Sequence, residues 1–425
     1  MNMAKQGAKT AVPSLRFPEF VGKPFREVQL KDVTAESITR NVDGLSTKSV
    51  MGVTKAEGIV PMRERLIASD IARYKVVQKD YFAYNPMRLN IGSIARWQGD
   101  SDILVSPDYV VFQCLKGPGS EIIPAYLDHF RQSAAWEKFV TEGGDGSVRV
   151  RIYYKDLARL QVTLPSPAEQ KKIAECLTSL GDMIAAQARK VEALRAHKRG
   201  LMQQLFPLEG EAVPRLRFPE FRDAPEWREG ALGSLTVKVG SGVTPRGGDS
   251  NYKRKGRPFV RSQNVGWGQL LLDDIVFIDE STHESFDGTE IADSDVLLNI
   301  TGASIGRSVI ADYRIAGGNV NQHVCIIRTN QGELNPELLS QFLISERGQE
   351  QIDGFQAGGN RQGLNFAQIR SFQIPLPPTR DEQKRISECL SSLDTQIAAE
   401  TRQLAALKTH KQGLMQQLFP AQRAG

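Results

Sequence analysis

The stretch HKRGLMQQLFP occupies His197–Pro207, and a nearly identical HKQGLMQQLFP occupies His410–Pro420. The match extends upstream at a constant offset to two openings with S/T-x-x-E spacing, Ser166–Glu169 and Thr379–Glu382. Such spacing is typical of a capping box, in which the hydroxyl and the carboxylate each satisfy a backbone N–H at a helix start. The chain is therefore predicted to contain two long copies of one helix.

Apolar residues follow each opening at spacings of three and four, which is the pattern of a heptad seam. The predicted seam residues are Ile173, Leu177, Leu180, Ile184, Leu194 and Leu201 in the first copy, and Ile386, Leu390, Leu393, Ile397, Leu407 and Leu414 in the second. Both copies interrupt the seam at the same two places, with Gln187 and Glu400 at one and Lys198 and Lys411 at the other. A polar seam residue usually fixes the register of two helices at some cost in stability. One apolar stripe can be ordinary core packing, but two matched stripes indicate two helices of about 38 residues, each roughly 57 Å long, that pack against each other.

A second repeat shows how the copies are joined. VPSLRFPEF at Val12–Phe20 reappears as VPRLRFPEF at Val213–Phe221. In the middle of the chain, the first QLFP runs through a short linker into the second of these motifs. The two chain ends carry the same two motifs, as if one such junction had been cut open. A circular, pseudo-two-fold arrangement with antiparallel helices is the simplest interpretation.

The blocks between entry motif and helix share little with each other, and each is predicted to be a compact mixed domain. Short β-branched and aromatic runs alternate with turns, and helical stretches follow. The runs are Tyr109–Gln113, Asp295–Asn299 and His323–Ile327, and the helical stretches are Pro124–Phe139 and Pro336–Phe355. The predicted fold class is α+β, with two mixed α/β domains separated by a long antiparallel two-helix coiled coil. The predicted divisions are a disordered N-terminus at 1–11, a first domain at 12–165, a central helix at 166–207, a linker and second domain at 208–378, and a C-terminal helix at 379–425.

Composition narrows the class of protein. The formal net charge of +5 over 425 residues permits a nucleic-acid partner without demanding one. Four cysteines without C-x-x-C spacing, and a start at Met1 without an apolar signal segment, predict a reduced, cytoplasmic protein. No apolar run approaches the length of a membrane span, about 18 residues. The five histidines show no metal-ligand spacing, so no metal site is predicted.

Enzymatic motifs are incomplete. Asn85–Arg88 reads NPMR, which lacks the second proline and the stacking aromatic of an amino-methyltransferase, so a turn at a strand end is the better interpretation. Thr301–Arg307 is glycine-spaced but has no G-K-[ST] for phosphates and magnesium. Catalysis within this chain is not expected.

Basic and amide side chains gather in both blocks. Arginine and lysine neutralise phosphates, and arginine, asparagine and glutamine read base edges. The DNA-binding candidates are Arg246, Lys253, Arg254, Lys255, Arg261 and Asn264 in the second block and Arg63 and Arg65 in the first. A glycine-flanked loop adds Asn360, Arg361 and Gln362, and Arg149 lies at the corresponding place in the first block. The alternative, a solvated charged face and a flexible loop, stays open for each.

Taken together, these motifs resemble the specificity subunits of Type I restriction–modification systems. The most specific parts are the two copies of L-P-(x)-x-x-x-E-Q-x-x-I-x-x-x-L, at Leu164–Leu177 and Leu376–Leu390, with the repeated HKxGLMQQLFP. Other segments are similar to target-recognition-domain cores, namely Phe82–Ser93, Val105–Phe112, Arg261–Asn264, Thr301–Gly306 and Asn319–Gln322.

The resemblance implies a non-catalytic DNA reader. Each block would bind one half of an asymmetric, bipartite site in double-stranded DNA, and the helical pair would set the spacing and dock two modification subunits. Those partners would carry S-adenosylmethionine and methylate adenine, and restriction subunits would add ATP- and Mg-dependent translocation and cleavage. No cofactor is expected in this chain.

The alternative is a scaffold whose two blocks bind proteins on a coiled-coil hub. Salt-dependent DNA binding by the chain with its partner would separate the two hypotheses, because counterion release accompanies phosphate contacts.

Overall fold

A computed structural model describes residues 12–42, 44–117, 121–142, 151–286, 288–356 and 363–419. The chain divides into unit 1, made of Met1–Ala186 and Leu404–Gly425, and unit 2, made of Gln187–Gln403. Each unit holds one variable block and part of each long helix. The segment 1–11, predicted to be disordered, lies outside the described residues, and the domain boundaries given above stay predictions.

Unit 1 is built on a four-stranded antiparallel sheet in the order β2-β9-β6-β7. Its strands are β2 (Thr34–Ser37), β9 (Val110–Cys114), β6 (Phe82–Tyr84) and β7 (Ile94–Arg96). Three antiparallel pairs accompany it: β1 (Arg26–Gln29) with β10 (Gln161–Leu164), β3 (Met51–Thr54) with β4 (Gly58–Pro61), and β5 (Lys75–Val77) with β8 (Ile103–Val105). The helices of the block are α1 (Pro124–Phe130), α2 (Ala134–Glu142) and α3 (Tyr154–Leu157).

The core of unit 1 follows from the alternation of side chains along its strands. Phe82 of β6 and Phe112 of β9 point to one face and stack with ring centroids 5.0 Å apart. They join α1, α2 and the long helices in one apolar cluster. The intervening Ala83 and Val111 join a second cluster with β5 and β8. The sheet is therefore buried on both faces.

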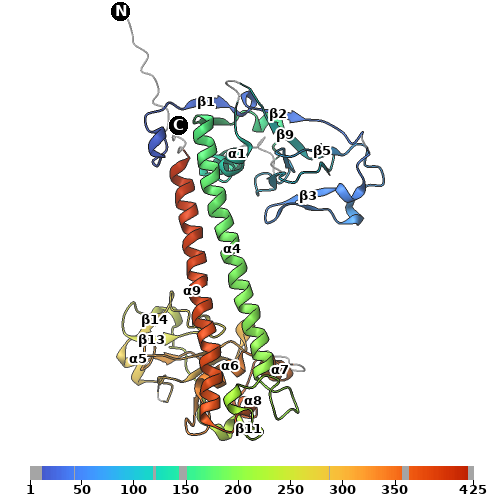
Figure 1. Cartoon of the computed structure of the whole chain (residues 1–425). Helices are drawn as coiled ribbons and strands as arrows, with labels where there is room; N and C mark the ends of the chain where they lie inside the picture. Colours follow the sequence, from blue (N-terminus) through green and yellow to red (C-terminus); the bar gives the residue numbers. More distant parts are fainter. Residues whose placement is uncertain are drawn as a thin grey trace, which may run out of the picture. The chain divides into compact units, whose positions relative to one another are not determined.

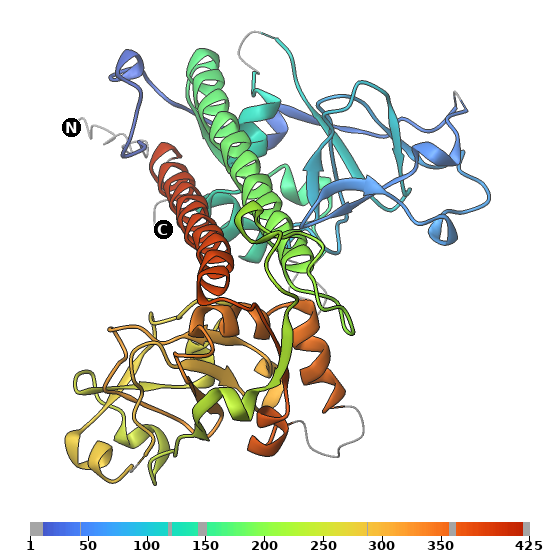
Figure 2. The ribbon, with the colours of Figure 1, turned by 60° about the horizontal axis from the view of Figure 1, so that its bottom comes forward.

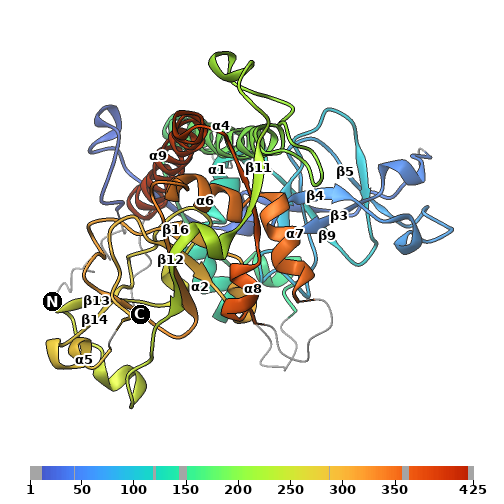
Figure 3. The ribbon, with the colours of Figure 1, turned by 90° about the horizontal axis from the view of Figure 1, so that it is seen from below.

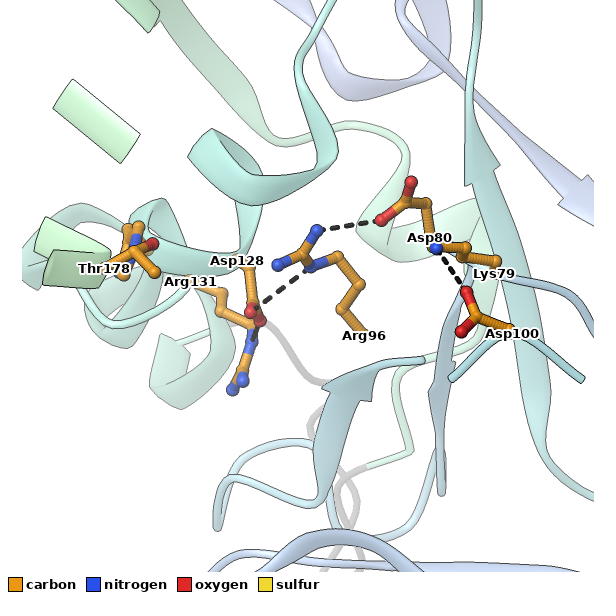
Figure 4. A network of polar contacts seen from close by, with 8 residues as sticks. Lys79, Asp80, Arg96, Asp100, Asp128, Arg131 and Thr178 are labelled. Atoms are coloured by element: carbon orange, nitrogen blue, oxygen red, sulfur yellow. Dashed lines mark hydrogen bonds and ion pairs between the residues drawn. The ribbon is translucent and has the colours of Figure 1, made fainter. Parts of the chain in front are cut away.

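A polar network fastens the sheet of unit 1 to α1 (Figure 4). Arg96, at the end of β7, forms an ion pair with Asp80 at 2.8 Å and a longer one, 3.5 Å, with Asp128 of α1. Asp128 also receives Arg131 at 2.7 Å. The carboxylate of Asp128 thus lies between two arginines, with a hydrogen bond from Arg131 and a longer ion pair with Arg96.

Unit 2 repeats this plan with a sheet in the order β12-β18-β15-β16. Its strands are β12 (Thr236–Ser241), β18 (Val324–Thr329), β15 (Val296–Asn299) and β16 (Ser308–Ile310). A three-stranded sheet holds β14 (Val276–Ile278), β13 (Arg257–Val260) and β17 (Asn319–Val320), and β11 (Arg228–Ala231) pairs with β19 (Gln373–Leu376). The helices are α5 (Glu280–Glu284), α6 (Pro336–Leu343), α7 (Glu346–Gly354) and α8 (Phe366–Arg370).

The faces of this sheet are also both covered. Val296 and Leu298 of β15 pack with α6, α8 and the long helices, whereas Leu297 packs with the three-stranded sheet. In Figure 3, β13, β14 and α5 lie to one side of β12, while α7 and α8 lie to the other. The orange helices of unit 2 border its yellow and light-green strands in Figure 2. The three predicted strand runs correspond to β9, β15 and β18, and each predicted helical stretch is two shorter helices, α1 with α2 and α6 with α7.

The two long helices are α4 (Pro167–Leu205) and α9 (Arg380–Leu418), each 39 residues without a break (Figure 1). The hydroxyl half of each predicted capping box is present, because Ser166 Oγ accepts from the Glu169 N–H at 3.4 Å and Thr379 Oγ1 from the Glu382 N–H at 3.2 Å. The carboxylate half is used differently. The Glu169 carboxylate receives Arg16, and that of Glu382 receives Arg217, in paired bonds of 2.7 to 2.8 Å.

The contacts that join entry motif to helix recur in both units. The Leu15 N–H donates to the Gln417 carbonyl at 3.0 Å, and the Leu216 N–H to the Gln204 carbonyl at 2.9 Å. The glutamine that follows each capping glutamate also makes an equivalent hydrogen bond in both units. Gln170 Oε1 accepts from the Ile123 N–H at 2.9 Å, and Gln383 Oε1 accepts from the Asn335 N–H at 2.8 Å. Leu15 and Gln417, which are 402 positions apart in the chain, therefore make in unit 1 the hydrogen bond that Leu216 and Gln204 make in unit 2.

The seam residues lie at the packed faces of both units. Ile173, Leu177, Leu180, Ile386 and Leu390 are buried. The others, Ile184, Leu194, Leu201, Leu393, Ile397, Leu407 and Leu414, are half-buried. At the first polar interruption Gln187 meets Glu400, its own equivalent 213 residues later, through 2.6 Å and 3.0 Å hydrogen bonds to the side chain and backbone. Such a contact between equivalent positions is what two antiparallel copies of one helix produce where they cross.

Candidate nucleic-acid interface

Three neighbouring strands of unit 2 present loops at one edge of the sheet. β12 and β15 end there and β18 begins there, since Ser241 pairs with Cys325 and Asn299 with Val324. Thr244, Thr301, Gln322 and His323 follow or precede these strand ends. This polar group, which we call the unit 2 edge cluster, is half-buried except for Gln322, which is exposed.

The unit 2 edge cluster is a connected chain of hydrogen bonds. The Thr244 hydroxyl bonds Gln322 Oε1, Gln322 Nε2 contacts His323 Nε2 at 3.0 Å, and His323 Nδ1 contacts Thr301 Oγ1 at 2.6 Å. With the amide donating to Nε2, the imidazole carries its proton on Nδ1 and donates it to Thr301. The amide of Gln322 is then held in one orientation with one N–H and one lone pair left over. That pair of groups matches the N7 and N6 positions of adenine in the major groove.

The same edge anchors the chain that follows the glycine-flanked loop. Gly363 forms a β-bridge with Thr301, and the Leu364 N–H donates to the Ile300 carbonyl at 2.9 Å. The predicted DNA-binding residues Asn360, Arg361 and Gln362 lie outside the described residues. The segment that follows them, Gly363 and Leu364, lies directly beside the unit 2 edge cluster.

Unit 1 has a corresponding edge with different side chains. Tyr84 of β6 pairs with Val110 of β9, and the Ile152 N–H donates to the Pro86 carbonyl at 3.0 Å. A cavity of about 330 Å³ lies here, and its lining includes Glu36, Lys75, Asn85, Asp108 and Tyr153. Arg149, which precedes this anchor, lies outside the described residues. The NPMR segment is the expected turn after a strand, with Asn85 Oδ1 accepting from the Met87 N–H at 3.0 Å.

Lys75 gives the unit 1 edge a buried cation. Its ammonium donates to the Tyr109 carbonyl at 2.7 Å. Burial lowers the pKa of Lys75, and the nearby Glu36 and Asp108 oppose that shift. The edge of unit 1 therefore combines a fixed ammonium with carboxylates, whereas that of unit 2 combines an amide, an imidazole and two hydroxyls.

The basic cluster predicted in unit 2 is divided by the structure into paired and exposed members. Lys253 lies 3.8 Å from Asp279, and Arg261 lies 3.6 Å from Asp274 with its guanidinium over the Tyr252 ring. Arg246, Arg254 and Lys255 are exposed and form no ion pair within the described ranges. Among the described residues, these three can contact phosphates without first breaking an ion pair, and Lys253 is also exposed beside Asp279.

Asn264 has a different place from the one expected of a base reader. Its side chain is fully buried. Its amide donates to the Leu271 carbonyl at 2.8 Å and to Asp274 at 2.9 Å, and its Oδ1 accepts from the Arg261 N–H at 2.9 Å. Because every one of these bonds shapes the turn before β14, Asn264 is a structural residue of that turn and is not free to contact a base.

Arg63 and Arg65 of unit 1 flank and enter a short 3-10 helix, Glu64–Leu66, that follows β4. Both are exposed and neither forms an ion pair in the part of the chain that the structure describes. Residues that sequence reasoning missed are Thr244 and His323, whose position only the pairing of the sheet reveals, and Lys75 as a buried group.

Two absences concern the described residues alone. They contain no group of three or more His, Cys, Asp or Glu side chains placed to hold a metal ion. Among them there is also no helix of the length and apolar character that a membrane span needs.

Comparison with known proteins agrees with this architecture. Residues 226–409 match the family described as Type I restriction modification DNA specificity domain. The chain is 23% identical over 398 residues to the putative type I restriction enzyme MjaX specificity subunit of Methanocaldococcus jannaschii, covering 92% of this chain and 88% of that protein. It is 27% identical over 149 residues to the type I restriction enzyme EcoKI specificity subunit of Escherichia coli, covering 33% of this chain and 30% of that protein.

Solved structures show the same fold. The crystal structure of the Type-I restriction-modification system S subunit from M. genitalium has a TM-score of 0.63 at 13% identity, covering 97% of this chain and 100% of that one. A chain from a structure of complex assembly and conformational transition of a type I R-M system has a TM-score of 0.53 at 18% identity, covering 94% and 98%.

Residues 226–409 therefore match a DNA specificity domain of Type I restriction–modification systems. The chain as a whole is similar to the specificity subunits of those systems, in agreement with the resemblance of its repeats.

Proposed function

We propose that this chain reads an asymmetric, bipartite site in double-stranded DNA, with one half-site bound by each unit. The observation that carries the proposal is the sheet edge that recurs in both units with different side chains. A repeated framework supports two readers. Val324 and Val110 occupy the same place in the two sheets, so Gln322 and His323 correspond to Asp108 and Tyr109 in unit 1. The difference between these side chains supports the recognition of two different sequences.

The chain itself is proposed to be non-catalytic. Two modification subunits would dock on it and methylate adenine with S-adenosylmethionine, and restriction subunits would supply ATP- and Mg-dependent cleavage. The exposed cations Arg246, Arg254 and Lys255 would contact phosphates, together with Arg63 and Arg65 in unit 1. The loop residues Asn360, Arg361 and Gln362, and Arg149 in unit 1, remain candidates for base or phosphate contacts.

The test is a genome-wide map of methylated adenines in cells that carry the complete system. Gln322→Leu removes the amide of the unit 2 edge cluster at nearly constant volume. If that amide reads a base, discrimination at one base pair of one half-site falls by about 1–3 kcal/mol, and the other half-site is unchanged. Gln331→Leu, at an exposed turn of the same unit, is the matched control.

Arg254→Ala distinguishes phosphate contact from base reading. A phosphate contact predicts weaker binding to every sequence, with a shallower salt dependence and an unchanged methylated motif. A methylated motif that both Gln322→Leu and Arg254→Ala leave intact, together with salt-independent DNA binding by the assembled complex, would contradict the proposal and favour the scaffold alternative.

A further inference from the structure

Lys198 and Lys411 are equivalent residues with different surroundings. They occupy the second polar interruption of the seam, one in unit 2 and one in unit 1. Where unit 2 has Asp394 in α9, the equivalent position in α4 of unit 1 is Gly181. Where unit 2 has Gln341 in α6, the equivalent position in α1 is His129. The same framework is therefore completed by a carboxylate in one unit and not in the other.

In unit 2 the Asp394 carboxylate accepts hydrogen bonds from both Lys198 and Gln341. It accepts from Lys198 Nζ at 2.6 and 2.7 Å and from Gln341 Nε2 at 2.7 Å. The side chain of Lys198 is only 9% exposed. A cation this buried needs such a partner, because leaving it unpaired costs the full penalty of its lost hydration.

In unit 1 the ammonium of Lys411 lies close to Gly181, the position from which the equivalent aspartate side chain would extend. A Cβ built on Gly181 would lie 3.1 Å from Lys411 Nζ. The nearby Asp128 is already engaged by Arg96 and Arg131. No carboxylate among the described residues forms an ion pair with Lys411. Burial lowers the pKa of Lys411, and Asp128 and Asp182 oppose the shift only through space.

Beside Lys411 lies a cavity of about 430 Å³ that unit 1 leaves open. Its polar lining includes Gln132, Glu137, Lys408, Lys411, Gln412 and Gln416. Two lysines against one glutamate give the lining a net positive charge. The glutamine amides supply donors and acceptors of the kind that a peptide backbone needs.

We propose that this cavity receives an aspartate or glutamate side chain of the docked modification subunit, whose carboxylate pairs with Lys411 as Asp394 pairs with Lys198. The inference rests on the proposed function, which supplies the partner. A protein side chain is favoured over a free anion because the cavity is several times the size of a carboxylate and is lined by amides as well as ammonium groups. Charge complementarity selects an acidic partner segment.

Zero-length carbodiimide coupling of the full chain assembled with its modification subunit tests the contact directly. Coupling joins carboxylates to lysines that are already in contact, and peptide mass spectrometry identifies the pair. The expected product joins Lys411 to an aspartate or glutamate of the modification subunit. An assembled complex that couples elsewhere between subunits, while Lys411 couples only within its own chain or not at all, would overturn the inference but not the proposed function. A chain that forms no complex at all would refute both.

Two variants separate docking from folding. Gly181→Asp supplies the carboxylate internally, so it is expected to raise the thermal midpoint of the free chain and to weaken binding of the modification subunit about tenfold. Lys411→Met is expected to weaken binding by a similar factor without raising the midpoint. Lys384→Met, which removes a 68% exposed lysine of α9 within unit 2, is the control for charge.

Unchanged binding by both Gly181→Asp and Lys411→Met would overturn the inference. If a free anion occupied the cavity instead, saturating acetate would raise the thermal midpoint of the unaltered free chain but not that of Lys411→Met. The coupled product between Lys411 and the modification subunit would also be missing.

Discussion

The junction of entry motif and helix is nearly the same in the two units, whereas the seam beyond it differs. Each unit has an ion pair with two hydrogen bonds, Arg16 with Glu169 in unit 1 and Arg217 with Glu382 in unit 2. Both carboxylates are only 1% exposed. A few turns further on, the equivalent lysines meet a carboxylate in unit 2 and a glycine in unit 1. The repeated ion pairs are structural, because each joins an entry motif to the first turn of a long helix. The difference at the lysines shows where two copies of one framework have been free to diverge.

The largest expected effect comes from the shared junction. Glu382→Ala leaves the Arg217 side chain, 7% exposed, without its partner, and should destabilise unit 2 by about 3–5 kcal/mol. Glu382 also accepts from Trp227 Nε1 at 3.1 Å, whereas the equivalent residue in unit 1, Phe25, lies under Arg16 and donates no hydrogen bond. Glu169→Ala should therefore cost less than Glu382→Ala. Chemical denaturation measures both, and equal losses would mean that the tryptophan bond contributes nothing.

A control for that comparison lies on the surface of α4. Glu175→Ala removes a carboxylate that is 62% exposed and 3.8 Å from Lys171. Its effect should stay within about 0.5 kcal/mol.

The next effect in size concerns the lysines of the seam. Asp394→Ala leaves Lys198 and Gln341 without their acceptor and should cost about 2–4 kcal/mol, since Asp394 itself is 25% exposed. Lys411→Met breaks no ion pair and should cost less than about 1 kcal/mol. The double variant Lys198→Met/Asp394→Leu, which removes both charges, should recover most of the loss. If the double variant is as unstable as Asp394→Ala, packing rather than charge explains the cost.

The smallest effect concerns pH and His129. Burial, reinforced by Lys411, lowers its pKa from 6.5 to about 4, while Asp128 raises it and Arg96 and Arg131 lower it. The unfolded state therefore binds a proton that the folded state refuses between about pH 6.5 and pH 4. Stability is full above that window and falls by on the order of 2 kcal/mol as the pH drops through it. His129→Gln, which copies unit 2, should flatten this part of the pH profile. An unchanged profile would assign the acid sensitivity to other groups.

The long helices were predictable because several local signals agreed. The capping hydroxyls, the heptad spacing and the repeat all indicate the same segments, and both helices begin within a residue of the expected place. The carboxylate half of the box was predicted wrongly in its role, because Arg16 and Arg217 arrive from distant sequence and bind more strongly than a backbone N–H.

The candidate site was less predictable for a physical reason. Thr244, Thr301 and His323 are far apart in the chain, and only the order β12-β18-β15 brings their loops together. Asn264 has a side chain of the type that can read a base, but it forms hydrogen bonds with backbone groups and with Asp274 instead. Side-chain type alone does not distinguish those two uses.

The division of the chain has a consequence for the order in which it folds during synthesis. Unit 2 is one continuous stretch, Gln187–Gln403, so all of its core residues are available before the last turns of α9 are made. The core of unit 1, in contrast, includes Leu418 and Phe419, and the ring of Phe419 lies 5.3 Å from Tyr126 and 5.8 Å from Phe130. Of the two units, unit 1 therefore begins first in the chain and is completed last. Until Leu418 and Phe419 have been made, the Tyr126 and Phe130 rings lack the cover of Phe419, so a nascent chain that stops before these residues is expected to expose part of this aromatic core.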